Sequence, residues 1–108
     1  MNWNTLNKID QLEEINKASF KHPVVIFKHS TRCGISNMVL KKFEAEINQQ
    51  NQLNSEFYFL DLIKDRAVSN AVAEKFNVVH QSPQLIVIKN GRVVHHASHY
   101  SINLQEVS

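Results

Sequence analysis

The chain has 108 residues, 43% of them hydrophobic, and its 12 Lys and Arg against 10 Asp and Glu leave a formal net charge of +2. This length predicts a single domain over residues 1–108, and so small a charge argues against nucleic acid as a partner. The polar N-terminus does not resemble a signal peptide, and no apolar run approaches the ~20 residues of a membrane-spanning helix. We therefore expect a cytoplasmic monomer that binds neither nucleic acid nor a membrane.

The first half of the chain has two helical patterns with a strand pattern between them. Apolar residues at every third position from 6 to 18 predict a first helix, for which Thr5 is a suitable cap. The run Val24–Lys28 has no polar alternation, which is typical of a strand buried on both faces. A second amphipathic pattern then predicts a helix from about Ile35 to about Gln49.

The second half predicts a strand, a helix and a hairpin. The strand is Phe57–Leu62, the third helix runs from Asp65 to about Asn77, and the hairpin joins Gln84–Ile88 to Arg92–His96 through Asn90-Gly91. Ser101 is expected to cap a short last helix containing Ile102, Leu104 and Val107. The resulting α/β order, αβαβαββα, is the thioredoxin-like layout of a four-stranded mixed sheet with helices on both faces.

Cys33, the only cysteine, lies between the predicted buried strand and the second helix. Unpaired N–H groups and the positive end of the macrodipole at a helix N-terminus favour a thiolate, and Arg32 and His29 are expected to add positive potential. Gly34 leaves room for a second sulfur. A lone cysteine can instead be inert and buried, but this polar setting favours a reactive nucleophile. The predicted active-site loop comprises His29, Ser30, Thr31, Arg32, Gly34 and Ser36.

The motif Cys33-Gly34-Ile35-Ser36 is a Cys-x-x-Cys pattern in which an oxygen replaces the second sulfur. A dithiol enzyme frees itself from a mixed disulfide by attack of its second cysteine, and this chain contains no such resolving thiol. Cys33 must therefore be released by another molecule. Ser36 is expected to bond the sulfur or cap the helix, because an unactivated hydroxyl is a poor nucleophile.

Pro83 immediately precedes the first predicted strand of the hairpin, where thioredoxin-like proteins carry a cis proline facing the active-site cysteine. The fold analogy therefore predicts a cis bond at Ser82–Pro83, although a trans proline at the start of an edge strand is the alternative. The backbone of Ser82 would then be free to pair with an extended ligand. Ser82 and Pro83 are the predicted substrate-binding residues.

Six histidines raise the question of a zinc site. Neighbouring residues of a strand point to opposite faces, so the adjacent His95 and His96 are poorly placed to bind one ion. We expect these two residues, together with His80 and His99, to be solvated histidines near strand ends. No metal site is predicted.

The string Lys28-His29-Ser30-Thr31-x-Cys33-x-Ile35-Ser36 resembles the active-site signature of the monothiol bacilliredoxins, the YtxJ-like family. The likeness continues through residues 57–62, 78–88 and 95–99, and so covers nearly the whole chain. It implies that Cys33 is the nucleophile of a thiol-disulfide oxidoreductase that removes bacillithiol from protein mixed disulfides. The implied partners are S-thiolated client proteins and a low-molecular-weight thiol, with bacillithiol as co-substrate and no tightly bound cofactor.

One position departs from the family pattern. Gly34 stands where the family commonly has proline, and Cys-Gly-x-Ser is also similar to the monothiol glutaredoxins, which use glutathione and bind an iron–sulfur cluster. Against that likeness, Gln81-Ser82 precedes Pro83 where glutaredoxins have Thr-Val, and the glutathione-binding Gly-Gly motif is missing after the hairpin. A dimer that holds an iron–sulfur cluster through Cys33 therefore stands as the alternative function.

Overall fold

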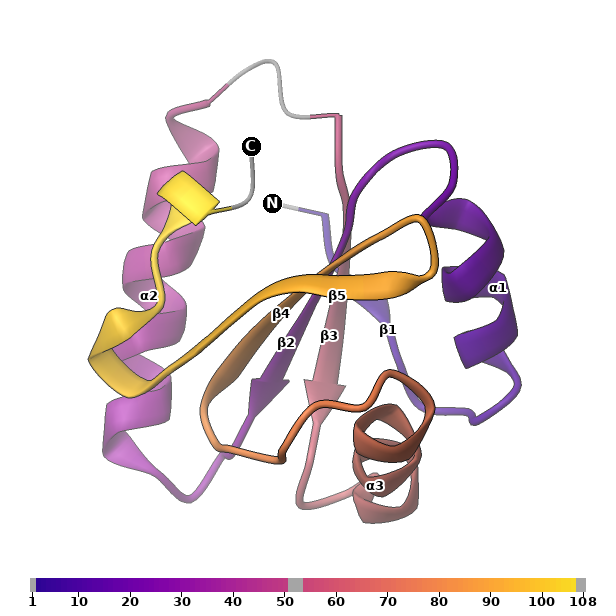
Figure 1. Cartoon of the computed structure of the whole chain (residues 1–108). Coiled ribbons are helices and arrows are strands. Elements are labelled where there is room, and N and C mark those ends of the chain that lie inside the picture. Colours follow the sequence, from indigo (N-terminus) through magenta and orange to yellow (C-terminus); the bar gives the residue numbers. More distant parts are fainter. Residues whose placement is uncertain (1, 51–53, 107–108) are drawn as a thin grey trace.

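The computed structural model describes residues 2–50 and 54–106, which are built around a five-stranded mixed sheet (Figure 1). The strand order is β1-β3-β2-β4-β5, with β1 and β2 parallel to β3, β4 antiparallel to β2, and β5 antiparallel to β4. The strands are β1 (Asn4–Thr5), β2 (Val24–His29), β3 (Glu56–Asp61), β4 (Gln84–Lys89) and β5 (Arg92–Ser98). Every residue of the central strand β2 is buried, which confirms the interpretation of its unbroken apolar run.

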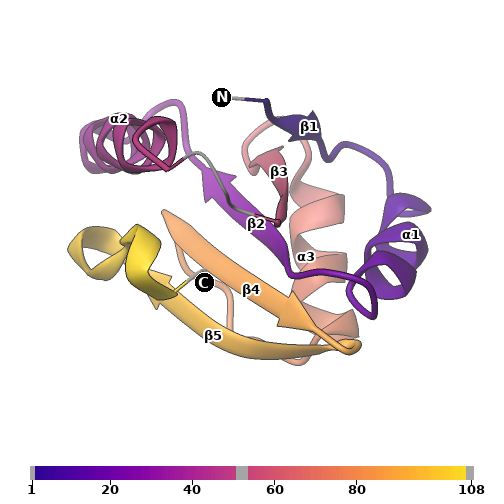
Figure 2. The ribbon, with the colours of Figure 1, turned by 90° about the horizontal axis from the view of Figure 1, so that it is seen from above.

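Helices cover both faces of the sheet (Figures 1 and 2). Helices α1 (Gln11–Ala18) and α3 (Arg66–Lys75) pack on one face, and α2 (Gly34–Asn48) packs on the other. Because side chains alternate along a strand, Ile26 joins the core with α1 and α3, whereas Phe27 joins the core with α2. This is the predicted thioredoxin-like arrangement. No helix among the described residues is long and apolar enough to span a membrane.

The N-terminal segment differs from the prediction, because a fifth strand precedes the expected helix and residues 6–10 are not helical. Thr5 lies in β1 and is not a cap, and the backbone N–H of Leu6 continues the pairing by donating to the Phe59 carbonyl at 2.9 Å. Helix α1 begins only at Gln11. Leu6 is fully buried as the chain leaves the sheet, whereas Ile9 is 53% exposed, so the apolar spacing spans two different elements.

The C-terminal segment forms two short 3₁₀ helices, η1 (His99–Ser101) and η2 (Leu104–Glu106), in place of one α-helix. Ser101 is therefore the last residue of η1 and not a cap, and Val107 lies outside the described residues. Ile102 is extended and only 1% exposed, because its side chain packs into the core beside α2. Burial of Ile102 thus interrupts the helix that the sequence pattern predicted.

The β4–β5 hairpin turns at Asn90-Gly91, as the sequence predicted. Both residues have positive φ, 53° and 78° respectively, which suits the tight turn between twisted strands. The turn is tied to the end of α1, where the Ser19 carbonyl accepts from the Asn90 N–H and the Ser19 Oγ accepts from the Gly91 N–H, both at 2.8 Å. These bonds leave little space at Gly91, where a Cβ would lie 3.1 Å from Phe20 Cζ.

Candidate active site

Cys33 occupies the N-cap position of α2, at the head of the helix, as predicted. Its backbone is extended, with φ −110° and ψ 118°, and its N–H donates to the Ser30 carbonyl at 3.2 Å, which closes the turn between β2 and α2. The Cys33 carbonyl accepts the N–H of Asn37 at 3.2 Å and so starts the helix. Cys33 is partly exposed and is therefore not buried in the core.

Cys33 lies where the backbone N–H groups of the first turn of α2 have no acceptor within the helix. The first turn of α2 contains no acidic residue, and the Cys33 side chain makes no capping hydrogen bond. No carboxylate of the first turn therefore competes for these N–H groups or for the positive end of the helix macrodipole. Arg32 and Thr31 precede Cys33 with exposed side chains, and Gly34 has no atom within 4 Å of the place that a Cβ would occupy.

His29 and Ser36 form a buried polar pair beneath the loop. The His29 Nδ1 lies 2.7 Å from the Ser36 Oγ, which also accepts the Ser30 N–H at 3.1 Å. The Ser36 hydroxyl thus bonds these groups, whereas the sequence predicted that it would bond the sulfur or cap the helix. Burial lowers the pKa of His29, although Asp61 and Glu44 act in the opposite direction. Burial therefore disfavours the charged form of His29, which argues against the expectation that His29 adds positive potential.

The Ser82–Pro83 peptide bond is cis, which confirms the prediction made from the fold analogy. Pro83 is buried and Ser82 half-buried, directly before β4. The antiparallel pairing of β2 with β4 ends with Lys28 opposite Gln84. The chain therefore enters β4 through Pro83 at the same end of the sheet at which it leaves β2 toward Cys33 (Figure 1).

Two residues near this end of the sheet have contacts that the sequence analysis missed. His80 was expected to be solvated, but it is half-buried, and its Nδ1 lies 3.1 Å from the Nζ of Lys28. Lys28 is fully buried in β2. The sequence feature that could have indicated the burial of Lys28 is its place directly after the unbroken apolar run 24–27. In residues 2–50 and 54–106 no three His, Cys, Asp or Glu side chains are grouped so that they could hold a metal ion.

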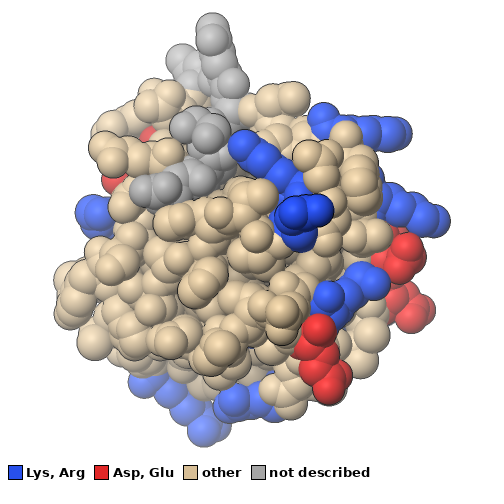
Figure 3. All heavy atoms as spheres, in the orientation of Figure 1, with Lys and Arg blue, Asp and Glu red and all other residues tan. Residues whose placement is uncertain are grey.

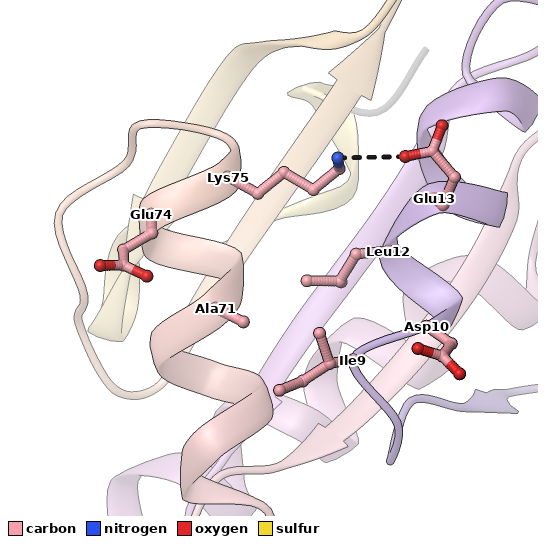
Figure 4. A pocket seen from close by; sticks show the side chains of 7 residues that line it. All are labelled: Ile9, Asp10, Leu12, Glu13, Ala71, Glu74 and Lys75. Carbon is pink, nitrogen blue, oxygen red and sulfur yellow. Dashed lines mark hydrogen bonds and ion pairs between the residues drawn. The ribbon is translucent and has the colours of Figure 1, made fainter.

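A separate groove lies between α1 and α3 (Figure 4). Its lining includes the exposed Ile9 and an ion pair in which the Lys75 Nζ is 3.3 Å from a carboxylate oxygen of Glu13. None of the predicted site residues lines this groove. The sequence-based site and the groove are therefore distinct features of the molecule.

The fold and the placement of its single cysteine define a monothiol protein of the thioredoxin fold. A solved structure described as a suspected oxidoreductase with a thioredoxin fold is 31% identical, with a TM-score of 0.79 and coverage of 94% of this chain and 86% of that chain. The family model of the monothiol bacilliredoxin BrxC matches residues 4–107, and the chain belongs to this family.

Thioredoxins share the fold at lower identity. The Fasciola hepatica thioredoxin is 22% identical, with a TM-score of 0.67 and coverage of 89% of this chain and 86% of that chain. The Malassezia sympodialis thioredoxin is 19% identical, with a TM-score of 0.68 and coverage of 91% and 79%. These two structures support only the fold of this chain, whereas the family match supports a monothiol oxidoreductase of the thioredoxin fold.

Proposed function

We propose that this chain removes a low-molecular-weight thiol, bacillithiol, from protein mixed disulfides, with Cys33 as the nucleophile. The observation that carries the proposal is the position of the single cysteine at the partly exposed head of α2. Membership of the monothiol bacilliredoxin family supports bacillithiol as the co-substrate. S-thiolated proteins are then the clients.

The proposed reaction consists of two thiol–disulfide exchanges. The Cys33 thiolate attacks the bacillithiol sulfur of the client mixed disulfide, so that a new S–S bond forms and the client leaves as a thiolate that takes a proton from solvent. A second bacillithiol, also as its thiolate, attacks the bacillithiol sulfur on Cys33 and releases the Cys33 thiolate. The client cysteine ends reduced, and the two bacillithiol molecules end joined as a disulfide.

The head of α2 supports the first step. Only the thiolate is a good nucleophile, and the N–H groups of the first helical turn stabilise negative charge on the Cys33 sulfur. The same groups stabilise that charge again when the second exchange releases Cys33. The exposed Arg32 next to it adds a cation that also attracts carboxylate-bearing thiols.

The segment Ser82–Pro83 is the proposed binding site for the client backbone. Pro83 has no N–H to donate, and the adjacent half-buried Ser82 is the residue whose backbone we assign to pairing with an extended client segment. Residues 93–105 contain no Lys, Arg, Asp or Glu. Figure 3 shows the corresponding surface over the second half of β5 and η1 as an uncharged area, which suits clients of varied charge.

The test is transfer from a client protein that carries one bacillithiol mixed disulfide. We expect the wild-type chain with free bacillithiol to accelerate release of the client thiol, and intact-mass spectrometry to show one bacillithiol on Cys33 during turnover. Cys33→Ser should abolish both signals. Release at the wild-type rate by Cys33→Ser would refute the proposal.

A matched control variant keeps a single thiol but places it on α3 and not at the head of α2. Asn70 is exposed in α3, so the double variant Cys33→Ser with Asn70→Cys has a single accessible thiol away from the head of α2. We expect this variant to release the client no faster than a free small thiol at the same concentration. Acceleration equal to that of wild type would mean that the position of Cys33 contributes nothing.

A further inference from the structure

Two fully buried polar side chains lie beneath the segment that leads to Pro83. Lys28 of β2 and Gln84 of β4 are both 0% exposed, and they are partners in the antiparallel register. Two residues along each strand, Ile26 and Ile86 belong to the core that packs against α1 and α3, so both polar side chains point to that face. Burial of such groups is costly unless they are hydrogen-bonded.

Gln84 bonds the backbone of this segment twice. Its Nε2 donates to the Val79 carbonyl at 2.9 Å, and its Oε1 accepts the Gln81 N–H at 3.2 Å. One side chain therefore satisfies two backbone groups that lie two residues apart. Val79 itself is 77% exposed, so these bonds, and not burial of its side chain, hold it in place.

Lys28 contacts His80, the residue between Val79 and Gln81. Its Nζ donates to the Ser69 carbonyl of α3 at 3.1 Å and lies 3.1 Å from the His80 Nδ1. An ammonium group has no lone pair, so it donates to an unprotonated His80 Nδ1. The Ser69 Oγ lies 3.4 Å from the same nitrogen. Lys28 thus connects β2, α3 and the segment before Pro83.

The charges around Lys28 agree with this arrangement. Burial and the nearby Arg66 lower the pKa of Lys28 to about 8, so the amine remains largely protonated at neutral pH. Burial, together with Lys28 and Arg66, lowers the pKa of His80, which favours the neutral ring that can accept a hydrogen bond from Lys28. No carboxylate is paired with Lys28 among the described residues. The polar partners of its Nζ are the Ser69 carbonyl of α3 and the His80 ring.

We propose that Lys28 and Gln84 are positioning residues that fix the segment Val79–Pro83 for binding of the client. The inference rests on the proposed function, because it assigns a task to the same site. Contacts from Lys28 and Gln84 fix three consecutive residues, 79–81, and so keep the Ser82 backbone in one conformation. A fixed conformation lowers the entropic cost of binding an extended client. A small disulfide that reacts with Cys33 without pairing to this segment gains nothing from the arrangement.

The first test is amide hydrogen exchange of the reduced full chain. In Gln84→Met the Gln81 N–H loses its acceptor, so we expect its exchange to accelerate at least tenfold while the amides of β2 remain protected. Lys28→Met should accelerate exchange across residues 79–82, and Lys21→Met, which alters an exposed lysine, should not. Unchanged exchange in both site variants would overturn the proposal.

The second test compares the kinetics of the variants with a bacillithiolated client and with bacillithiol disulfide. For Lys28→Met and Gln84→Met we expect KM for the bacillithiolated client to rise at least fivefold, with kcat and the rate of Cys33 attack on bacillithiol disulfide within twofold of wild type. An equal loss toward both substrates would overturn the positioning role. A wild-type chain without any transfer would refute the proposed function instead, while hydrogen exchange would still decide whether the pair holds the segment.

Discussion

Replacing Lys28 by methionine removes a buried amine while keeping a long side chain of similar reach. Burial and Arg66 lower the pKa of Lys28 from 10.5 to about 8 in the folded chain. In the unfolded chain the amine is solvated and keeps its ordinary value. Between these two pH values the unfolded chain binds more protons than the folded chain, so the free energy of unfolding rises with pH.

The size of the effect follows from the two pKa values. Each pKa unit corresponds to about 1.4 kcal/mol, so a difference of about 2.5 means that the charged amine opposes folding by about 3 kcal/mol below pH 8. This opposition fades as the pH rises toward 10.5. From pH 7.5 to 10, where most of the change falls, we expect the free energy of unfolding of the wild type to rise by about 2 kcal/mol relative to Lys28→Met.

The assay is urea unfolding of both proteins, followed by circular dichroism at pH values from 7.5 to 10 with a reductant present. Taking the difference between the proteins removes the contributions of other titrating groups, such as Tyr58, whose pKa burial raises. Lys21→Met, which replaces an exposed lysine, is the matched control. A difference between wild type and Lys28→Met that stays constant across this range would mean that Lys28 is not a buried cation.

Three further predictions concern the glycines, the serine of the motif and the alternative function. Gly34→Pro should fold and raise the free energy of unfolding in urea by about 0.5 kcal/mol, because the first helical position accepts proline, the backbone of Cys33 is suited to precede one, and the space is open. Gly91→Ala should lower the free energy of unfolding by more than about 1 kcal/mol, because φ is 78° and Phe20 is close. Equal effects of the two substitutions would refute this reasoning. Ser36→Cys should supply a resolving thiol, so that thiol titration after mild oxidation finds neither cysteine free and the bacillithiol adduct no longer accumulates; persistence of the adduct at the wild-type level would contradict the monothiol interpretation. Anaerobic reconstitution with iron and sulfide should leave a colourless monomer, whereas a brown dimer would support the iron–sulfur alternative.

The main elements of the fold were predictable because each has a local signal. The apolar run of β2, the amphipathic pattern of α2 and the turn at Asn90-Gly91 all appear where the sequence placed them. Strand β1 was missed because two residues carry no periodicity, and it is defined by pairing with distant β3. The C-terminal helix was wrong because burial of Ile102, a long-range packing effect, outweighs local helical spacing.

The positions of the site residues in the fold were predictable, but the contacts among the buried side chains around them were not. Cys33 at the head of α2 and the cis bond before Pro83 follow from the order of elements and the fold analogy. The lowered pKa of His29 depends on its burial, with Phe27 and Phe59 beside the ring, which only the packed structure reveals. Likewise, the bond between Lys28 and the segment before Pro83 joins residues 52 positions apart.

In the proposed reaction the sulfur of Cys33 takes the small thiol from the client and passes it to a second bacillithiol. The most direct measurement is a single-turnover reaction of the wild-type chain with a bacillithiolated client, quenched with acid and followed by intact mass. We expect a bacillithiol adduct on Cys33 that forms as fast as the client is freed and disappears when bacillithiol is added. A client that is freed while Cys33 stays unmodified at every time point would contradict it.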